Sequence, residues 1–342
     1  MVSSRTPDPS PTTLRAGGDP DGEGRRRAWS RRADPIFRGV LIVAASSVLL
    51  VLAAMILRTT WEAWPVFAKE GLIGFVTGEQ WSVGTSRSEV TGTYGAWPFI
   101  YGTLKISFLA ILFAVPLAIG IALFTNEIAP AWLRRPLTYT VDTLAMVPSI
   151  VYALVGMYFF RIYVWAPIGR VIADSPLGAL TFFSGPVLLS SYWSAANILA
   201  IMILPIITAI CRDVFAQIPQ DEVNAAYAMG ATRWEVMRRV IVPHSFSGIV
   251  GGTMLGLGRA LGETLAVAVL IGSSQRWAPR LFFGGDAMPA VIANTFADAH
   301  PEAIWALLAI GVTLFVFTMI VNVAARIIVV RVSGRLGGGA IV

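Results

Sequence analysis

The sequence predicts an all-α integral membrane protein with about six transmembrane helices. Apolar residues make up 56% of the 342-residue chain and charged residues only 13%, about half the charged share of a soluble domain. The apolar residues are gathered into runs long enough to cross a bilayer, since about 20 helical residues span its hydrocarbon core. Basic residues cluster between these runs and form no single stripe, which indicates membrane topology and not a nucleic-acid-binding surface.

The N-terminal part divides into a tail and a first span. Residues 1–34 are rich in Pro, Gly and Arg and lack helical apolar periodicity, so we expect a disordered cytoplasmic tail. The apolar run 36–57 follows a group of arginines and is too long for a typical cleaved signal peptide, which predicts an uncleaved anchor. Residues 35–98 are therefore expected to hold the first transmembrane helix and an extracytoplasmic loop.

Five further apolar runs predict the remaining spans, at 99–125, 137–160, 187–210, 245–271 and 305–327. Pro148 is expected to kink the second of these runs. Lys and Arg are more frequent in the tail, in the connections 126–136 and 211–244, and after the last span, so the positive-inside rule places both termini in the cytoplasm. Residues 328–342 then form a cytoplasmic C-terminal tail of a multi-pass plasma-membrane protein.

The connection 211–244 carries the signals of two short helices. Acidic residues follow Pro219, as at a helix start, and Gly230 is placed to end that helix. Thr232 and Glu235 have the spacing of a capping box, which predicts a second helical turn. The small side chains of the first helix would allow another protein to approach closely, and an amphipathic helix lying on the membrane surface is the alternative.

The fifth predicted span contains an isolated pair of charges, Arg259 and Glu263, in the segment GLGRALGET. Counted from the start of the run, Arg259 lies about 21 Å into a core about 30 Å thick, so its charge must face protein or water. On a continuous helix both charges fall on the face of Gly248, Gly252 and Gly256. Such a face either packs closely on another helix or leaves space beside an aqueous path.

Two interpretations of the charge pair stay open at this point. In the first, Arg259 and Glu263 bridge as neighbours one helical turn apart and hold the span to a partner helix. In the second, Arg259 faces a translocation path and binds an anion, because a planar guanidinium suits oxyanions. Glu263 would then hold Arg259 when no anion is present.

Charged residues near the ends of the other spans are expected to have structural or solvated roles. Asp142 is expected to be an interfacial or capping residue near the cytoplasmic end of the third predicted span. Lys105, Arg161 and Arg170 are expected to be solvated flanking charges near the outer mouth, where they could also steer anions.

Several chemistries find no support in the residues. Cys211 is the only cysteine, and His244 and His300 lack ligand spacing, so no metal site is expected. The chain has no P-loop motif and is not expected to bind ATP itself. No nucleophile and base are paired within the spans, so we expect a transport subunit without a cofactor of its own, not an enzyme.

The connection 211–244 resembles the cytoplasmic signature of ABC importer permeases. Its spacing N-A-A-x3-G-x9-V-x-V-P is similar to the family's E-A-A-x3-G-x9-I-x-L-P and is carried by Asn224, Ala225, Ala226, Gly230 and Pro243. Asn224 stands where the family has Glu. The resemblance implies a coupling loop at about 213–243 that docks onto a cytoplasmic ATPase.

Four more segments are similar to the C-type permease of phosphate-specific transport systems, namely WPFIYGTLKIS, LAMVPSIVYALVG, ILPIITAICRDVF and GLGRALGETLAVAVLIG. The resemblance implies a type I ABC importer permease fold with its permease domain at 99–327. It also implies an A-type permease partner, a dimeric ATPase that binds ATP, and an extracytoplasmic phosphate-binding protein. Because the family transports an oxyanion, it makes Arg259 and Glu263 candidates for substrate translocation.

Two alternatives to a phosphate permease remain. Permeases for molybdate or sulfate have similar Arg–Gly–Glu segments, so charge alone does not separate the anions. An ATP-independent channel or secondary transporter is also possible in principle, but it would leave the small-residue cytoplasmic loop without a purpose.

Overall fold

The structure of the chain is a computed structural model that describes residues 20–84 and 89–336. It divides into two units, residues 1–57 and residues 58–342. In the first unit the described residues form one helix, the start of α1 (Pro20–Glu70). The expectation of a disordered tail is therefore wrong for residues 20–34, while residues 1–19 lie outside the described part. The apolar stretch of α1 from Phe37 is long enough to cross a membrane.

The second unit begins with the end of α1, a short helix and a pair of short strands. The end of α1 is followed by α2 (Leu72–Thr77) and by an antiparallel pair of strands, β1 (Trp81–Ser82) and β2 (Thr93–Tyr94). The carboxylate of Glu302 is buried and accepts hydrogen bonds from the backbone N–H groups of Thr91 and Gly92, both at 2.6 Å. This contact ties the predicted loop to the first turn of the last helix.

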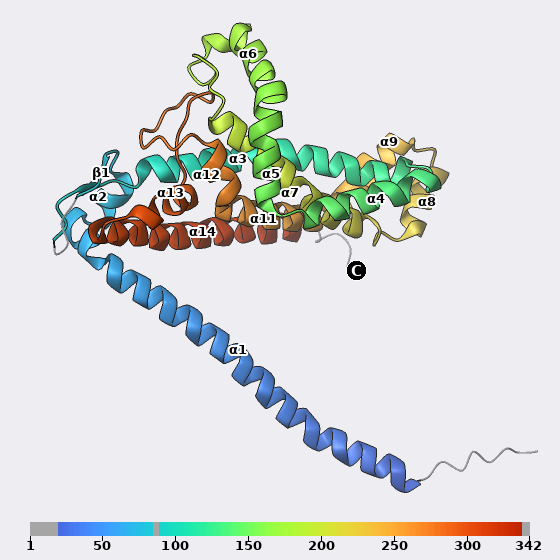
Figure 1. The fold of residues 1–342 in the computed structure, drawn as a ribbon. Helices are drawn as coiled ribbons and strands as arrows, with labels where there is room; N and C mark the ends of the chain where they lie inside the picture. Colours follow the sequence, from blue (N-terminus) through green and yellow to red (C-terminus); the bar gives the residue numbers. More distant parts are fainter. Residues whose placement is uncertain (1–19, 85–88, 337–342) are drawn as a thin grey trace, which may run out of the picture. The chain divides into compact units, whose positions relative to one another are not determined.

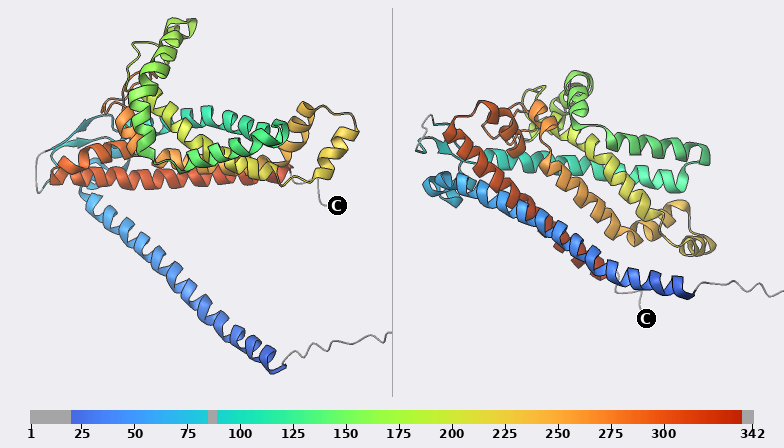
Figure 2. Two further views of the ribbon diagram at one scale, coloured as in Figure 1. Left: turned by 45° about the vertical axis from the view of Figure 1, so that its right-hand side comes forward. Right: turned by 60° about the horizontal axis from the view of Figure 1, so that its bottom comes forward.

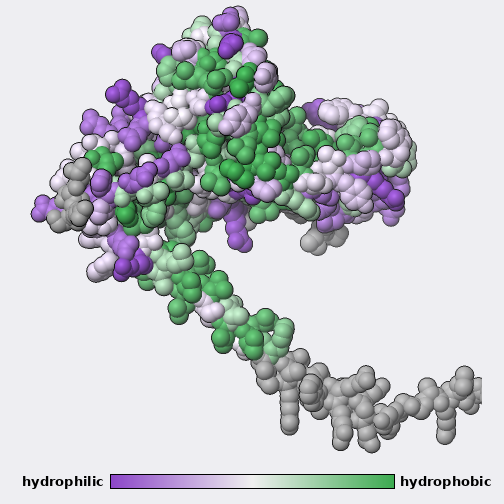
Figure 3. Space-filling model, in the orientation of Figure 1, coloured by the Kyte–Doolittle hydropathy of each residue, from purple (hydrophilic) through white to green (hydrophobic). Residues whose placement is uncertain are grey.

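Five long helices of this unit run side by side, as Figures 1 and 2 show. They are α3 (Trp97–Leu123), α4 (Ala131–Met146), α7 (Tyr192–Phe215), α11 (Phe246–Gly262) and α14 (Pro301–Leu336). In Figure 3 apolar side chains cover the middle of the unit over α3 and α5, and polar side chains gather toward its two ends. A different set of five helices among the described residues, which includes the apolar part of α1 and the stretch 149–174, is long and apolar enough to span a membrane. The number is six if one bent pair counts as a span.

The span predicted at 137–160 is wrong in its position along the chain. The chain is extended at Val147 and Pro148, because a residue before proline disfavours the helical conformation, and α4 ends at Met146. The apolar span instead comprises α5 (Ser149–Val155), the π-helical segment η2 (Gly156–Trp165) and α6 (Ala166–Asp174). It leaves the five-helix bundle at a steep angle (Figures 1 and 2).

Shorter segments complete the fold. They are η1 (Phe124–Ile128), η3 (Pro176–Ala179), α8 (Gln220–Ala228), α9 (Arg233–Val236), η4 (Met237–Ile241), α10 (Val242–His244), α12 (Leu265–Leu270), α13 (Met288–Thr295) and η5 (Phe296–Asp298). The last helix, α14, continues to Leu336, so most of the predicted C-terminal tail is helical as far as the structure describes it.

Helix α7 lies at the centre of the unit, and two rows of small residues surround it. On α3, the four fully buried alanines at four-residue spacing belong to the same core as α7, and they are Ala110, Ala114, Ala118 and Ala122. On α11, the predicted glycine face packs directly onto α7. A Cβ added at Gly248 would lie 2.5 Å from both methyl groups of Val214, and one at Gly256 would lie 2.7 Å from Cδ1 of Ile207.

Lys105 is not the solvated flanking charge that was expected, because its side chain is buried. Its ammonium donates to the backbone oxygens of Ala278, Pro279 and Arg280 at 3.1, 3.0 and 2.9 Å. It also lies 4.2 Å from the centre of the Tyr192 ring. Three carbonyls match the three protons of an ammonium, so Lys105 fixes the connection 271–287 to α3.

Two further charges have different surroundings. Arg161 is half-buried and donates to the hydroxyl of Ser190 at 3.1 Å, whereas Arg170 is exposed as expected.

In the connection 271–287, burial raises the pKa of Asp286 to about 7, and its carboxylate accepts a hydrogen bond from the backbone of Ala287.

The close approach of α11 to α7 predicts a contrast between two neighbouring glycines. Gly248→Ala should lower the free energy of unfolding by about 1–3 kcal/mol, because the added methyl overlaps Val214. Gly251→Ala, with nothing within 4 Å of its added methyl, should be neutral or stabilising by about 0.5–1 kcal/mol. Thermal unfolding in detergent measures both, and equal losses would contradict this packing.

The tether by Lys105 predicts a local loss of order. In Lys105→Met three backbone oxygens lose their donor, each at a cost of about 1 kcal/mol or more. Hydrogen–deuterium exchange of residues 272–287 should then become faster. Arg276→Met is the matched control, because Arg276 is exposed in the same connection, and its exchange should stay unchanged. Unaltered exchange in Lys105→Met would contradict the tether.

Candidate functional site

Arg259 lies in the last turn of α11 and is exposed. It is 13 residues from the start of the helix, or about 20 Å along the axis. A cation in the last turn is favourable, because the unpaired carbonyls of a helix C-terminus carry partial negative charge. The helix therefore holds a guanidinium at depth without burying it in the protein.

The predicted helix 245–271 is broken directly after this turn. Helix α11 ends at Gly262, Glu263 has an extended backbone with φ −71° and ψ 122°, and α12 begins at Leu265. Gly258 and Gly262 weaken the helix at this point, since glycine disfavours helix interiors. Non-helical backbone at membrane depth is tolerated only where protein covers it or water reaches it.

The break separates the two charges that the sequence places one helical turn apart. Glu263 is buried, with 9% of its surface exposed, whereas Arg259 is exposed. Within residues 20–84 and 89–336 no ion pair or hydrogen bond joins their side chains. The bridge between Arg259 and Glu263, on which the first interpretation of the pair depends, is therefore absent from the structure, because it requires a continuous helix.

Tyr152, in α5, holds the junction of α4 and α5, because its hydroxyl donates to the backbone oxygen of Leu144 at 2.7 Å. The chain is extended between these two residues at Pro148.

The glycines of α11 form two rows with different surroundings. Gly248, Gly252 and Gly256 face α7, where an added Cβ meets side-chain atoms at 2.5–3.1 Å. The second row, Gly251, Gly258 and Gly262, has nothing within 4 Å. At about 100° per residue this second row lies about 60–100° around the helix from Arg259. Its members nearest to Arg259 in sequence, Gly258 and Gly262, have open space at the position of an added Cβ.

The predicted helix pair of the connection 211–244 is confirmed. Helix α8 ends at Ala228, and Gly230 has φ 88°, which glycine adopts without strain. Thr232 and Glu235 form the capping box, with the Thr232 backbone N–H donating to Glu235 at 3.0 Å. Local chemistry alone determines these features, which is why the sequence could predict them.

Helix α8 presents small residues at the surface. Asn224, Ala225 and Gly230 are exposed and Ala226 is half-buried, while the buried Val223 anchors the helix. A hollow of about 340 Å³ adjoins them, lined by Ala226, Met229, Gly230, Ala231, Glu235, Val236, Arg239 and Val240. Pro243 lies in α10, three residues before α11 begins at Phe246.

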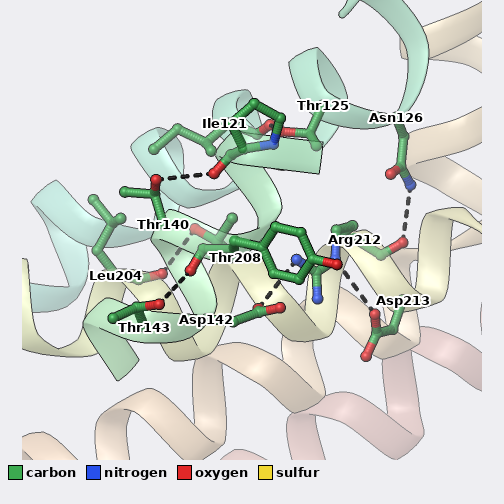
Figure 4. Close-up of polar contacts among 12 residues, drawn as sticks. Ile121, Thr125, Asn126, Thr140, Asp142, Thr143, Leu204, Thr208, Arg212 and Asp213 are labelled. Atoms are coloured by element: carbon green, nitrogen blue, oxygen red, sulfur yellow. Dashed lines mark hydrogen bonds and ion pairs between the residues drawn. The ribbon is translucent and has the colours of Figure 1, made fainter. Parts of the chain in front are cut away.

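Polar contacts fix the end of the bundle from which α8 projects (Figure 4). Arg212, near the end of α7, pairs with Asp142 of α4 at 3.2 Å and with Asp213 at 3.5 Å. The side chain of Asn126 donates to the backbone oxygen of Arg212 at 2.9 Å. Asp142, expected as an interfacial or capping residue, instead joins α4 to α7, and Arg212 is the partner that the sequence did not indicate.

Comparison with known proteins gives consistent results. Residues 114–334 match the family described as binding-protein-dependent transport system inner membrane component. The phosphate transport system permease protein PstC of Xylella fastidiosa strain 9a5c is 38% identical over 92% of this chain and 96% of the relative. The protein of the same name in Mesorhizobium japonicum is 39% identical over 89% of this chain and 92% of the relative.

Solved structures agree at the level of the fold. A chain from the crystal structure of a bacterial ABC transporter that imports alginate is 16% identical and superposes with a TM-score of 0.59, over 90% of this chain and 99% of that chain. An inward-facing methionine ABC transporter chain gives a TM-score of 0.51 at 18% identity, over 68% and 94%. The chain therefore belongs to the family of binding-protein-dependent transport system inner membrane components, in the branch of the C-type phosphate permeases.

Proposed function

We propose that the chain is the permease subunit of an ATP-driven importer of inorganic phosphate and forms half of its translocation pathway. The names of its relatives support phosphate as the substrate. The observation that carries the proposal in the structure is the exposed guanidinium of Arg259 at a helix break, beside an open row of glycines.

Three partners complete this transporter. An A-type permease forms the other half of the pathway and covers the open face of α11. A dimeric cytoplasmic ATPase binds and hydrolyses ATP, and an extracytoplasmic phosphate-binding protein delivers the anion. Both termini lie in the cytoplasm, and the excess of Lys and Arg in the terminal segments and in the connection 211–244 supports this orientation.

Arg259 is the group that attracts phosphate within the pathway. Its planar donors match two oxygens of a phosphate, and no carboxylate occupies them in the described residues. Glu263, four residues further along the chain and buried at the break, opposes prolonged binding of an anion. A weak site suits a permease, since the anion must also leave.

The role of Arg259 predicts a graded loss of phosphate uptake. Arg259→Ala should lower uptake by about 10- to 100-fold, because the anion loses a charged hydrogen-bonding partner. Arg259→Lys should be intermediate, because an ammonium keeps the charge without the two-oxygen geometry. Glu263→Gln should lose less than Arg259→Ala. Uptake of radioactive phosphate in cells lacking their own system, at matched membrane levels, measures all three.

Arg170→Ala is the matched control for these variants, since Arg170 is an exposed arginine on α6, away from the break. Its uptake should stay within about twofold of the unsubstituted protein. Competition by sulfate and molybdate during the same measurement identifies the transported oxyanion. Near-normal uptake in Arg259→Ala would leave that residue with a packing role only.

The docking of α8 predicts a separate effect on assembly. Ala226→Leu adds bulk beside the hollow under α8 and should reduce the ATPase recovered with the permease by about tenfold, the loss of one central interface contact. Gln217→Leu, exposed in the same connection but outside α8, should recover the ATPase normally. Full recovery in Ala226→Leu would show that the ATPase docks elsewhere.

A further inference from the structure

A contact between two polar side chains links α8 to α10, the short helix that directly precedes α11. Glu222 lies in the first turn of α8, and its Oε2 is 3.4 Å from Nδ1 of His244, the last residue of α10. The contact spans 22 positions of sequence and bypasses α9 and η4, which form the covalent route between the same two points.

The chain bends directly after His244. The helical stretch 233–244 and α11 meet at an angle of 70°. Ser245, between them, has φ −88° and ψ 4°, yet its backbone N–H still donates to Ile241 at 3.0 Å and its carbonyl accepts from Ile249 at 2.9 Å. The bend therefore keeps its backbone hydrogen bonds, so the change of direction costs no backbone pairing at Ser245.

The side chain of Ser245 is buried at the bend. Its hydroxyl is buried and has no hydrogen-bond partner among the described residues. A buried hydroxyl without a partner is uncommon and unfavourable. Ser245 is therefore the residue at which the two helical stretches change direction by 70°, with a side chain that no hydrogen bond holds within the described residues.

We propose that Glu222 and His244 transmit movement of α8 to α11, with Ser245 as the hinge between them. The proposal rests on the docking of α8 to the ATPase. When the ATPase displaces α8, the pair pulls on the end of α10, the angle at Ser245 changes, and α11 carries Arg259 with it. Both residues are positioning residues, since neither contacts the anion.

Energetic arguments favour transmission over a role in folding. Both side chains of the pair are 50% exposed. Exposed ion pairs contribute little to stability, because water and salt screen them. The pair should therefore affect how movement is transmitted without affecting how much folded protein is present, which gives a readout that separates the two roles.

The test uses the complete transporter in liposomes and measures phosphate imported per ATP hydrolysed. Glu222→Gln and His244→Gln should each lower this ratio by about two- to fivefold. This range corresponds to the free energy that one exposed pair of polar side chains contributes. The double variant should lose no more than either single one. Exchanging the partners, Glu222→His with His244→Glu, should restore at least about half of the ratio.

Asp221→Asn is the matched control, because Asp221 is an exposed acidic residue in the same turn of α8. It should keep the ratio of the unsubstituted transporter. Additive losses in the double variant, an equal loss in Asp221→Asn or an unchanged ratio in both single variants would overturn the inference. Loss of the ATPase from the Glu222→Gln complex would also overturn it, by assigning the pair to docking. Absence of phosphate import by the unsubstituted transporter would contradict the proposed function instead.

Discussion

The contact between the buried glycine face of α11 and the branched side chains of α7 determines where everything else in the second unit lies. Val214, Ile210 and Ile207 occupy the positions where side chains of α11 would otherwise stand. This contact fixes the rotation of α11 about its axis, and the rotation decides which residues stay uncovered. The second glycine row is uncovered because the first row is committed to α7.

Some of this arrangement follows from sequence and some does not. The connection 211–244 could be predicted in detail, because Gly230 and the Thr232–Glu235 box act through bonds within a few residues. Pro148 indicated a disturbance but not its size, since a proline either kinks a helix or ends it depending on its surroundings.

The candidate site was only partly predictable. Arg259 is conspicuous in an apolar run, but the break at Glu263 has no proline to announce it, and hydropathy continues through it. Assuming a continuous helix led to a bridge that does not form. Contacts between distant segments, such as Arg212 with Asp142 and Lys105 with the connection 271–287, depend on tertiary packing that the pattern of one chain does not reveal.

The break at Glu263 also separates the direction of α11 from that of α12. A continuous helix fixes the relative direction of its two ends through its backbone hydrogen bonds, whereas the extended residue Glu263 interrupts that ladder. The backbone therefore does not impose the tilt of α11 on α12 or on the following connection, which the ammonium of Lys105 holds to α3.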